Sequence, residues 1–179
     1  MKPMGPIPAW FAGEEGMLLI GGYGAASLVD EVGDTPLFAY DMDIVRAQIR
    51  RFREAMPQAL HLHYAIKANP YAPLLTAMAE QVDGFDIASG GELEMALAAG
   101  MDPARISFAG PGKRNDELEA AIFAGVTLNL ESEGEGRRAL AIGQRIGKTP
   151  RVAVRVNPDF DLKGSGMRMG GGAKPFGVD

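Results

Sequence analysis

The chain has 179 residues, about the length of one domain, and 46% of its residues are apolar while 23% are charged. This composition indicates a soluble globular protein and excludes a disordered or fibrous one. Eighteen basic residues stand against 23 acidic ones, giving a net charge of −5 without a basic cluster, which argues against a nucleic-acid partner and favours a small molecule. The absence of cysteine excludes disulfides, a thiolate nucleophile and zinc–sulfur sites.

The N-terminal region lacks the apolar run of a signal peptide, and no stretch reaches the ~20 apolar residues of a membrane span. We therefore expect a cytoplasmic protein without a membrane partner. Local patterns predict a strand over 18–22, a helix over 23–33, a strand over 36–40 and a helix over 41–56. These elements lack the small inward residues of the later strands, so residues 1–35 are expected to precede the main domain.

From residue 59 onward, short alternating runs are followed by segments with helical spacing. The predicted strands are 59–67, 84–88, 105–109, 126–131 and 151–157. The predicted helices between them are 71–81, 90–100, 115–125 and 133–147. Repeated strand–helix units predict a parallel sheet in an α/β fold.

Local capping signals agree with these helix boundaries. Ser89 with Glu92, and Ser132 with Glu135, have the S-x-x-E form in which the serine caps the helix start. Glycine stands where three of the helices are expected to end: Gly100, Gly125 and Gly147.

The strands carry apolar residues on one face and small or polar residues on the other. A strand covered by helices on both faces would be apolar throughout, so this pattern favours a closed (β/α)₈ barrel of the TIM type over an open doubly wound sheet. Polar residues gather at the last inward positions, where barrel active sites lie: Lys67, Glu131, Arg155 and Asn157, with Asp86 close by. The alternative is that these residues only fill a packed barrel core.

Lys67 is the least ordinary of these residues. An enclosed lysine needs a partner or a covalent role, because burial of an ammonium group is costly. Desolvation would make it a nucleophilic amine that forms a Schiff base with a carbonyl compound. The alternatives are a lysine that extends to the barrel mouth, or one that pairs with Asp86.

Two other features of the sequence resemble binding sites. His61 and His63 share a face but lack an obvious third ligand, so no metal site is predicted. The glycine-rich segment 164–172 lacks the arrangement of a phosphate-binding P-loop, and we interpret it as a loop over the barrel mouth.

Five segments, in order along the chain, resemble those of one enzyme family. They are HYAIKANP (63–70), DIASGGE (86–92), FAGPGK (108–113), NLES (129–132) and RVNP (155–158). The ordered set is similar to the fold-type III pyridoxal-phosphate enzymes, the alanine-racemase-like barrels that include diaminopimelate, ornithine and arginine decarboxylases. The first residues and the glycine-rich tail most resemble the decarboxylases associated with bacterial exosortase and exopolysaccharide gene clusters.

This resemblance implies a cofactor and a reaction. Lys67 would hold pyridoxal 5′-phosphate as a Schiff base, and the cofactor ring would take up the electrons left when carbon dioxide departs from an amino acid. Asp86, Glu92 and Arg155 match family residues around the cofactor or its lysine, although a capping role also explains Glu92. Arg155 needs an acceptor, which the cofactor or Glu131 supplies.

The resemblance also implies a longer enzyme. Only five of the eight barrel strands are predicted, so we interpret residues 36–179 as an incomplete pyridoxal-phosphate barrel and residues 1–35 as part of the family's β-domain. The complete enzyme is expected to be a homodimer that acts on an amino acid, free or carrier-bound, with diaminopimelate as the default. The 179-residue chain alone is expected to be inactive. An amino-acid racemase and a non-catalytic pyridoxal-phosphate-binding protein remain alternatives.

Overall fold

A computed structural model of the chain describes residues 10–157 and 175–178. The chain forms two compact units, residues 1–58 and residues 59–179. Each unit is described by itself. The division expected after residue 35 stays a prediction, and the predicted loop over 164–172 lies outside the described residues.

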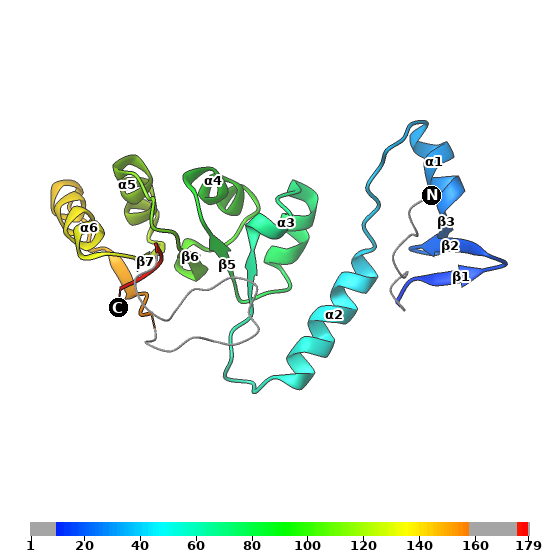
Figure 1. The fold of residues 1–179 in the computed structure, drawn as a ribbon, viewed down its shortest axis with the longest axis horizontal. Helices are drawn as coiled ribbons and strands as arrows, with labels where there is room; N and C mark the ends of the chain where they lie inside the picture. The colour runs from blue at the N-terminus through cyan, green and yellow to red at the C-terminus, as the bar shows by residue number, and fades with distance from the viewer. Residues whose placement is uncertain (1–9, 158–174, 179) are drawn as a thin grey trace. The chain divides into compact units, whose positions relative to one another are not determined.

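The first unit holds a small antiparallel sheet and two helices (Figure 1). Its strands are β1 (Ala12–Glu14), β2 (Met17–Ile20) and β3 (Tyr23–Gly24), and its helices are α1 (Ala25–Val32) and α2 (Met42–Ala55). Asp41 begins α2, since its Oδ1 accepts hydrogen bonds from the backbone N–H groups of Asp43 and Ile44.

Two features of this unit differ from the sequence predictions. The strand expected over 36–40 is wrong, because that segment pairs with no strand in the described part of the chain. Phe38 in it is 86% exposed, so it packs against no apolar layer formed by the described residues of this unit. Strand β1, which was not predicted, exists because the turn at Glu15 and Gly16 brings it beside β2.

The second unit is a five-stranded parallel sheet in which the strands follow one another in chain order. The strands are β4 (His63–Ala65), β5 (Gly84–Ile87), β6 (Ile106–Phe108), β7 (Thr127–Leu130) and β8 (Arg151–Val154). The α-helices are α3 (Ala72–Ala79), α4 (Gly90–Ala98), α5 (Asn115–Ala124) and α6 (Glu133–Ile146). Short 3₁₀ turns are η1 (Ile66–Ala68) and η2 (Pro103–Arg105).

Helices α3 to α6 lie in a row along one face of this sheet (Figure 1). The side chains that fill the layer beneath them come from alternate strand positions, and the largest are fully buried: Phe85, Ile87, Ile106, Phe108 and Leu128. Residues on the other face also share a register, since Ala65 pairs with Asp86, and Asp86 with Ser107. The predicted division into an apolar face under helices and a small or polar face is confirmed for β5, β6 and β7.

Strand β8 departs from this pattern on its apolar face. Val152, Val154 and Val156 are 51%, 59% and 67% exposed. None of the helices in the described ranges covers them. By their alternation these valines belong to the same face of the sheet that helices cover over β5, β6 and β7.

The helix boundaries follow the predicted capping signals. The Oγ atoms of Ser89 and Ser132 accept hydrogen bonds from the backbone N–H groups of Glu92 and Glu135. Gly125 and Gly147 end α5 and α6 in the left-handed conformation, with φ of 88° and 68°, which favours glycine. Of the helices in residues 10–157, none combines the length and apolar character needed to cross a membrane.

Candidate active site

A cavity of about 540 Å³ lies beyond the carboxyl ends of the parallel strands. Its wall is built from segments that end or follow β4 to β8: Lys67, Asp86, Ala88, Ala109, Gly110, Asn129, Arg155 and Phe176. Three of the four site residues predicted from the sequence, Lys67, Asp86 and Arg155, are therefore brought together although up to 88 positions (155 − 67) separate them in the chain.

Lys67 lies in the 3₁₀ turn η1, directly after β4, where the backbone N–H of Asn69 bonds to the carbonyl of Ile66 at 3.1 Å. The sequence placed it at the end of a longer strand. That boundary is wrong because the turn closes two residues earlier, ahead of Pro70. Lys67 is also exposed in this structure, not enclosed as expected, since among the described residues of the second unit the helices α3 to α6 cover only the opposite face of the sheet.

Asp86 is half-buried on the inward face of β5. Burial raises the pKa of its carboxyl, and this effect outweighs the opposing influence of Lys67, the Ser107 hydroxyl, His63 and Arg155. The Asp86 carboxyl therefore binds a proton more readily than the same carboxyl would in water, although the cations Lys67 and Arg155 oppose this effect. This arrangement is typical of functional sites.

A row of polar groups continues from Asp86 across the sheet. The hydroxyl of Ser107 on β6 lowers the pKa of Asp86, and it accepts a hydrogen bond from Asn129 Nδ2 on β7 at 2.6 Å. The three side chains occupy inward positions of neighbouring strands, so the polar face of the sheet leads into the cavity wall at Asn129.

Arg155 is held by the buried carboxylate of Glu131. The Nη1 of Arg155 lies 3.1 Å from Oε1 of Glu131, and its guanidinium lies 4.9 Å from the centre of the Phe176 ring. Glu131 also accepts bonds from the backbone N–H groups of Gly110 and Gly177 at 2.7 and 2.6 Å. Burial favours the neutral acid, but these donors and Arg155 lower the pKa of Glu131 overall. The ion pair that the sequence offered as an alternative for Arg155 is present.

Glu92 does not line this cavity. Its Oε2 accepts a hydrogen bond from the backbone N–H of Ala88 at 2.7 Å, while its own N–H bonds to Ser89. The carboxylate therefore bonds the residue before the N-cap of α4, one position earlier than the Ser89 N–H that the S-x-x-E pattern predicts. Its connection to the cavity runs through Ala88, which is a wall residue.

Sequence reasoning missed Lys113 and the buried role of Glu135. The sequence indicates Lys113 only as the last residue of the motif FAGPGK, and Glu135 only as a capping residue. In the structure they form an ion pair of 3.1 Å directly behind the cavity, with side chains 1% and 2% exposed. The sequence does contain one signal for this pair, because a lysine follows directly after a strand and a Gly-Pro-Gly turn. Its carboxylate partner, however, lies 22 residues further along the chain, so local patterns do not indicate the pairing.

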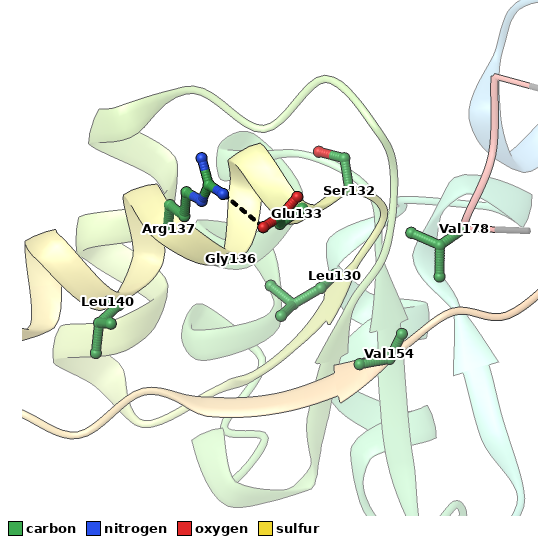
Figure 2. A pocket seen from close by; sticks show the side chains of 8 residues that line it. All are labelled: Leu130, Ser132, Glu133, Gly136, Arg137, Leu140, Val154 and Val178. Carbon is green, nitrogen blue, oxygen red and sulfur yellow. Dashed lines mark hydrogen bonds and ion pairs between the residues drawn. The ribbon is translucent and has the colours of Figure 1, made fainter.

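A second hollow, of about 380 Å³, lies on the helix-covered side of the sheet (Figure 2). Leu130, Leu140, Val154 and Val178 give it an almost wholly apolar wall, and the Glu133–Arg137 ion pair lies at its edge. Its charged lining residues, Glu133 and Arg137, are paired with each other, so the chemistry points to the first cavity. The residues that the structure describes contain no group of three His, Asp or Glu side chains placed to hold a metal ion.

Comparison with known proteins supplies the family. Residues 42–179 match the family described as pyridoxal-dependent decarboxylase, pyridoxal binding domain. The chain belongs to this family. The predicted fold class is thereby confirmed as the pyridoxal-phosphate-binding α/β barrel type, and five parallel strands of it are described.

Several relatives agree with this assignment. A diaminopimelate decarboxylase of Aquifex aeolicus is 39% identical over 92% of this chain and 39% of its own length. An L-glutamyl-[BtrI acyl-carrier protein] decarboxylase of Niallia circulans is 35% identical over 82% of this chain and 34% of its own. A solved diaminopimelate decarboxylase of Helicobacter pylori, complexed with L-lysine, has a TM-score of 0.75 at 32% identity and covers 86% of this chain and 40% of that one. The chain thus spans between about one third and two fifths of the length of these relatives.

Proposed function

We propose that the protein is a pyridoxal-phosphate-dependent amino-acid decarboxylase that binds its cofactor through Lys67. The observation that carries this proposal is the convergence of Lys67, Asp86 and Arg155 on one cavity at the carboxyl ends of parallel strands. In barrel enzymes of this kind, that end of the strands carries the active site.

The residues present fit the cofactor. Its aldehyde requires a primary amine, which Lys67 provides at the cavity wall, and its anionic oxygens suit a guanidinium such as that of Arg155. A cavity of about 540 Å³ is within the ~300–1,000 Å³ of small-molecule sites. The fit supports the cofactor that the family description names.

Each residue has a distinct role in this proposal. Lys67 would hold the cofactor covalently, because its primary amine at the cavity wall can condense with an aldehyde. Asp86 would act electrostatically on the amine of Lys67, and Arg155, fixed by Glu131, would bind an anionic oxygen of the cofactor. Glu92 acts on the cofactor only through the backbone of Ala88. When bound, pyridoxal phosphate supplies an electron sink for the electron pair left as carbon dioxide departs.

For the substrate we propose a free amino acid of the diaminopimelate type, because relatives of that name match most of this chain. A carrier-bound amino acid is the second candidate, favoured by the 35% identity to the decarboxylase of a glutamyl carrier protein. A homodimeric enzyme and a place among the exosortase-associated decarboxylases stay predictions from the sequence. The names of the relatives favour decarboxylation over racemisation.

The test starts from covalent binding. The complete gene product is incubated with pyridoxal phosphate, reduced with borohydride and digested, and the modified peptide is located by mass spectrometry. We expect the label on Lys67 and its loss in Lys67→Ala, with no loss in Lys148→Ala, whose lysine bonds the carbonyl of Phe123 away from the cavity.

Turnover is then measured as carbon dioxide released from meso-diaminopimelate, other amino acids and carrier-bound glutamate. Release that disappears in Lys67→Ala supports the proposal. A label spread over other lysines, or conversion of one enantiomer into the other without release of carbon dioxide, would overturn it.

A further inference from the structure

The buried pair of Lys113 and Glu135 is the most unusual charged feature outside the cavity wall. As whole residues they are 4% and 2% exposed. Removing two charges from water is costly, and a buried pair is often no more stabilising than apolar residues of the same size. Stability alone therefore does not explain this pair, and its hydrogen bonds indicate a second role.

Lys113 uses all three protons of its ammonium group. Nζ donates to the carbonyl of Gly110 at 2.7 Å, to the carbonyl of Asn129 at 2.8 Å and to Oε1 of Glu135 at 3.1 Å. Gly110 and Asn129 both line the cavity, whereas Lys113 does not. One buried cation therefore ties the loop after β6 to the end of β7 and to the first turn of α6.

Glu135 carries the connection further. Its second oxygen, Oε2, accepts a hydrogen bond from the backbone N–H of Glu131 at 2.8 Å. Glu131 in turn binds Arg155 through its side chain and the N–H of Gly110. A continuous chain of charge-assisted bonds thus runs from Lys113 to the guanidinium at the cavity.

We propose that Lys113 and Glu135 are positioning residues for the cofactor site: together they hold Gly110, Asn129 and, through Glu131, Arg155. This inference rests on the proposed function. Neither side chain touches the cavity, so their effect is on geometry and not on the reacting atoms. A geometric error of about 1 Å is enough to lower an enzymatic rate about 100-fold.

The experiment compares Lys113→Met, Glu135→Gln and the double variant K113M/E135Q in the complete gene product. Each single variant leaves one buried charge without its partner, and we expect a lower Tm. The double variant removes both charges, while the glutamine oxygen still accepts from the N–H of Glu131, so its Tm should return toward that of the parent. The carbonyls of Gly110 and Asn129 nevertheless lose their donor.

A matched control comes from the same helix. Glu133 and Arg137 form an ion pair of 2.6 Å whose side chains are 80% and 77% exposed. Because an exposed pair contributes little, Glu133→Gln should leave Tm close to that of the parent, and cofactor affinity and rate within about twofold of it.

Two readouts decide the matter. In K113M/E135Q we expect a 10- to 100-fold loss of pyridoxal-phosphate affinity and of kcat/KM. A loss of this size is what a displacement of the cavity residues by about 1 Å would cause. We also expect amide hydrogen exchange at Gly110 to rise at least tenfold, a change that needs no cofactor. Recovery of Tm together with parental affinity and exchange would overturn the proposal and leave a merely structural pair.

The exchange measurement separates this inference from the proposed function. If the parent protein binds no pyridoxal phosphate at Lys67, the proposed function fails on that result alone. Faster exchange at Gly110 in K113M/E135Q would still establish that the pair positions the cavity wall, and unchanged exchange would refute it.

Discussion

The carboxylate of Glu131 joins two parts of the cavity wall, with its Oε1 3.1 Å from Nη1 of Arg155 and 2.7 Å from the backbone nitrogen of Gly110. Its other oxygen accepts from Gly177 at 2.6 Å. These donors offset the cost of burying a charge that is 4% exposed. Glu131 therefore couples the loop after β6 to the residue that follows β8.

Replacing this carboxylate should cost stability. In Glu131→Gln the amide nitrogen faces N–H donors, so at least one buried bond is lost, and we expect a loss of about 1–3 kcal/mol at pH 7. Urea unfolding measures it. As a control, Glu119→Gln breaks an exposed pair with Arg145, and its loss of stability should be clearly smaller than that of Glu131→Gln.

The contribution of Glu131 to stability should depend on pH. Because folding lowers the pKa of Glu131, its stabilising contribution is complete above the ordinary value and is lost as the pH falls through the lower folded value. The stability difference between the parent and Glu131→Gln should therefore shrink in that acidic range. A difference that stays constant or grows on acidification would contradict the assigned shift.

Asp86 should behave in the opposite way. Folding raises its pKa, so the native state binds its proton more tightly than the unfolded chain does, and stability falls as the pH rises through that range. We expect Asp86→Asn to have a higher Tm than the parent at pH 7, with the gain vanishing in acid. Affinity for pyridoxal phosphate should fall at least about tenfold, a trade-off between stability and function. Thermal scans across pH and cofactor titration check both results.

Gly84 should tolerate no side chain. A Cβ there would lie 2.1 Å from the carbonyl oxygen of Arg105 and 2.6 Å from Cε1 of His63. The backbone contact cannot relax without moving a strand, so Gly84→Ala should cost about 1–3 kcal/mol. Gly91→Ala is the matched control: its nearest atom is Ser89 Oγ at 3.9 Å, and alanine favours the helix. Denaturant midpoints of the two variants should move in opposite directions.

Two variants distinguish whether Glu92 acts through its charge or through its hydrogen bond to Ala88. Glu92→Gln keeps an oxygen for the N–H of Ala88, so pyridoxal-phosphate affinity should stay within about twofold of the parent. Glu92→Ala removes that acceptor and should cost about 1 kcal/mol of stability. Titration and thermal unfolding measure both effects. If Gln loses as much affinity as Ala, the carboxylate acts on the cofactor by its charge and not through the cap.

Most of the second unit could be predicted from local patterns. Apolar alternation located β5, β6 and β7 because one face of each strand packs under helices. Serine caps and left-handed glycines located helix ends because those signals act within one turn. The family motifs likewise led to Lys67, Asp86 and Arg155, whose cavity the structure then displayed.

Other features needed the tertiary structure. The strand expected over 36–40 did not form because pairing requires a partner, and local propensity supplies none. The turn at Lys67 and its exposure depend on what surrounds the sheet, and the bond between Glu92 and Ala88 depends on how α4 begins. The pairing of Lys113 with Glu135 joins residues 22 positions apart.

The division has a physical reason. Periodicity and capping are properties of a few neighbouring residues, so the parallel strands, their covering helices and the candidate lysine are readable in the chain. Burial and ion pairing depend on which distant segments meet, and the sequence carries no local trace of that meeting. Only the folded chain therefore decided that a buried lysine and glutamate stand behind the site and that Glu131 holds Arg155 at its wall.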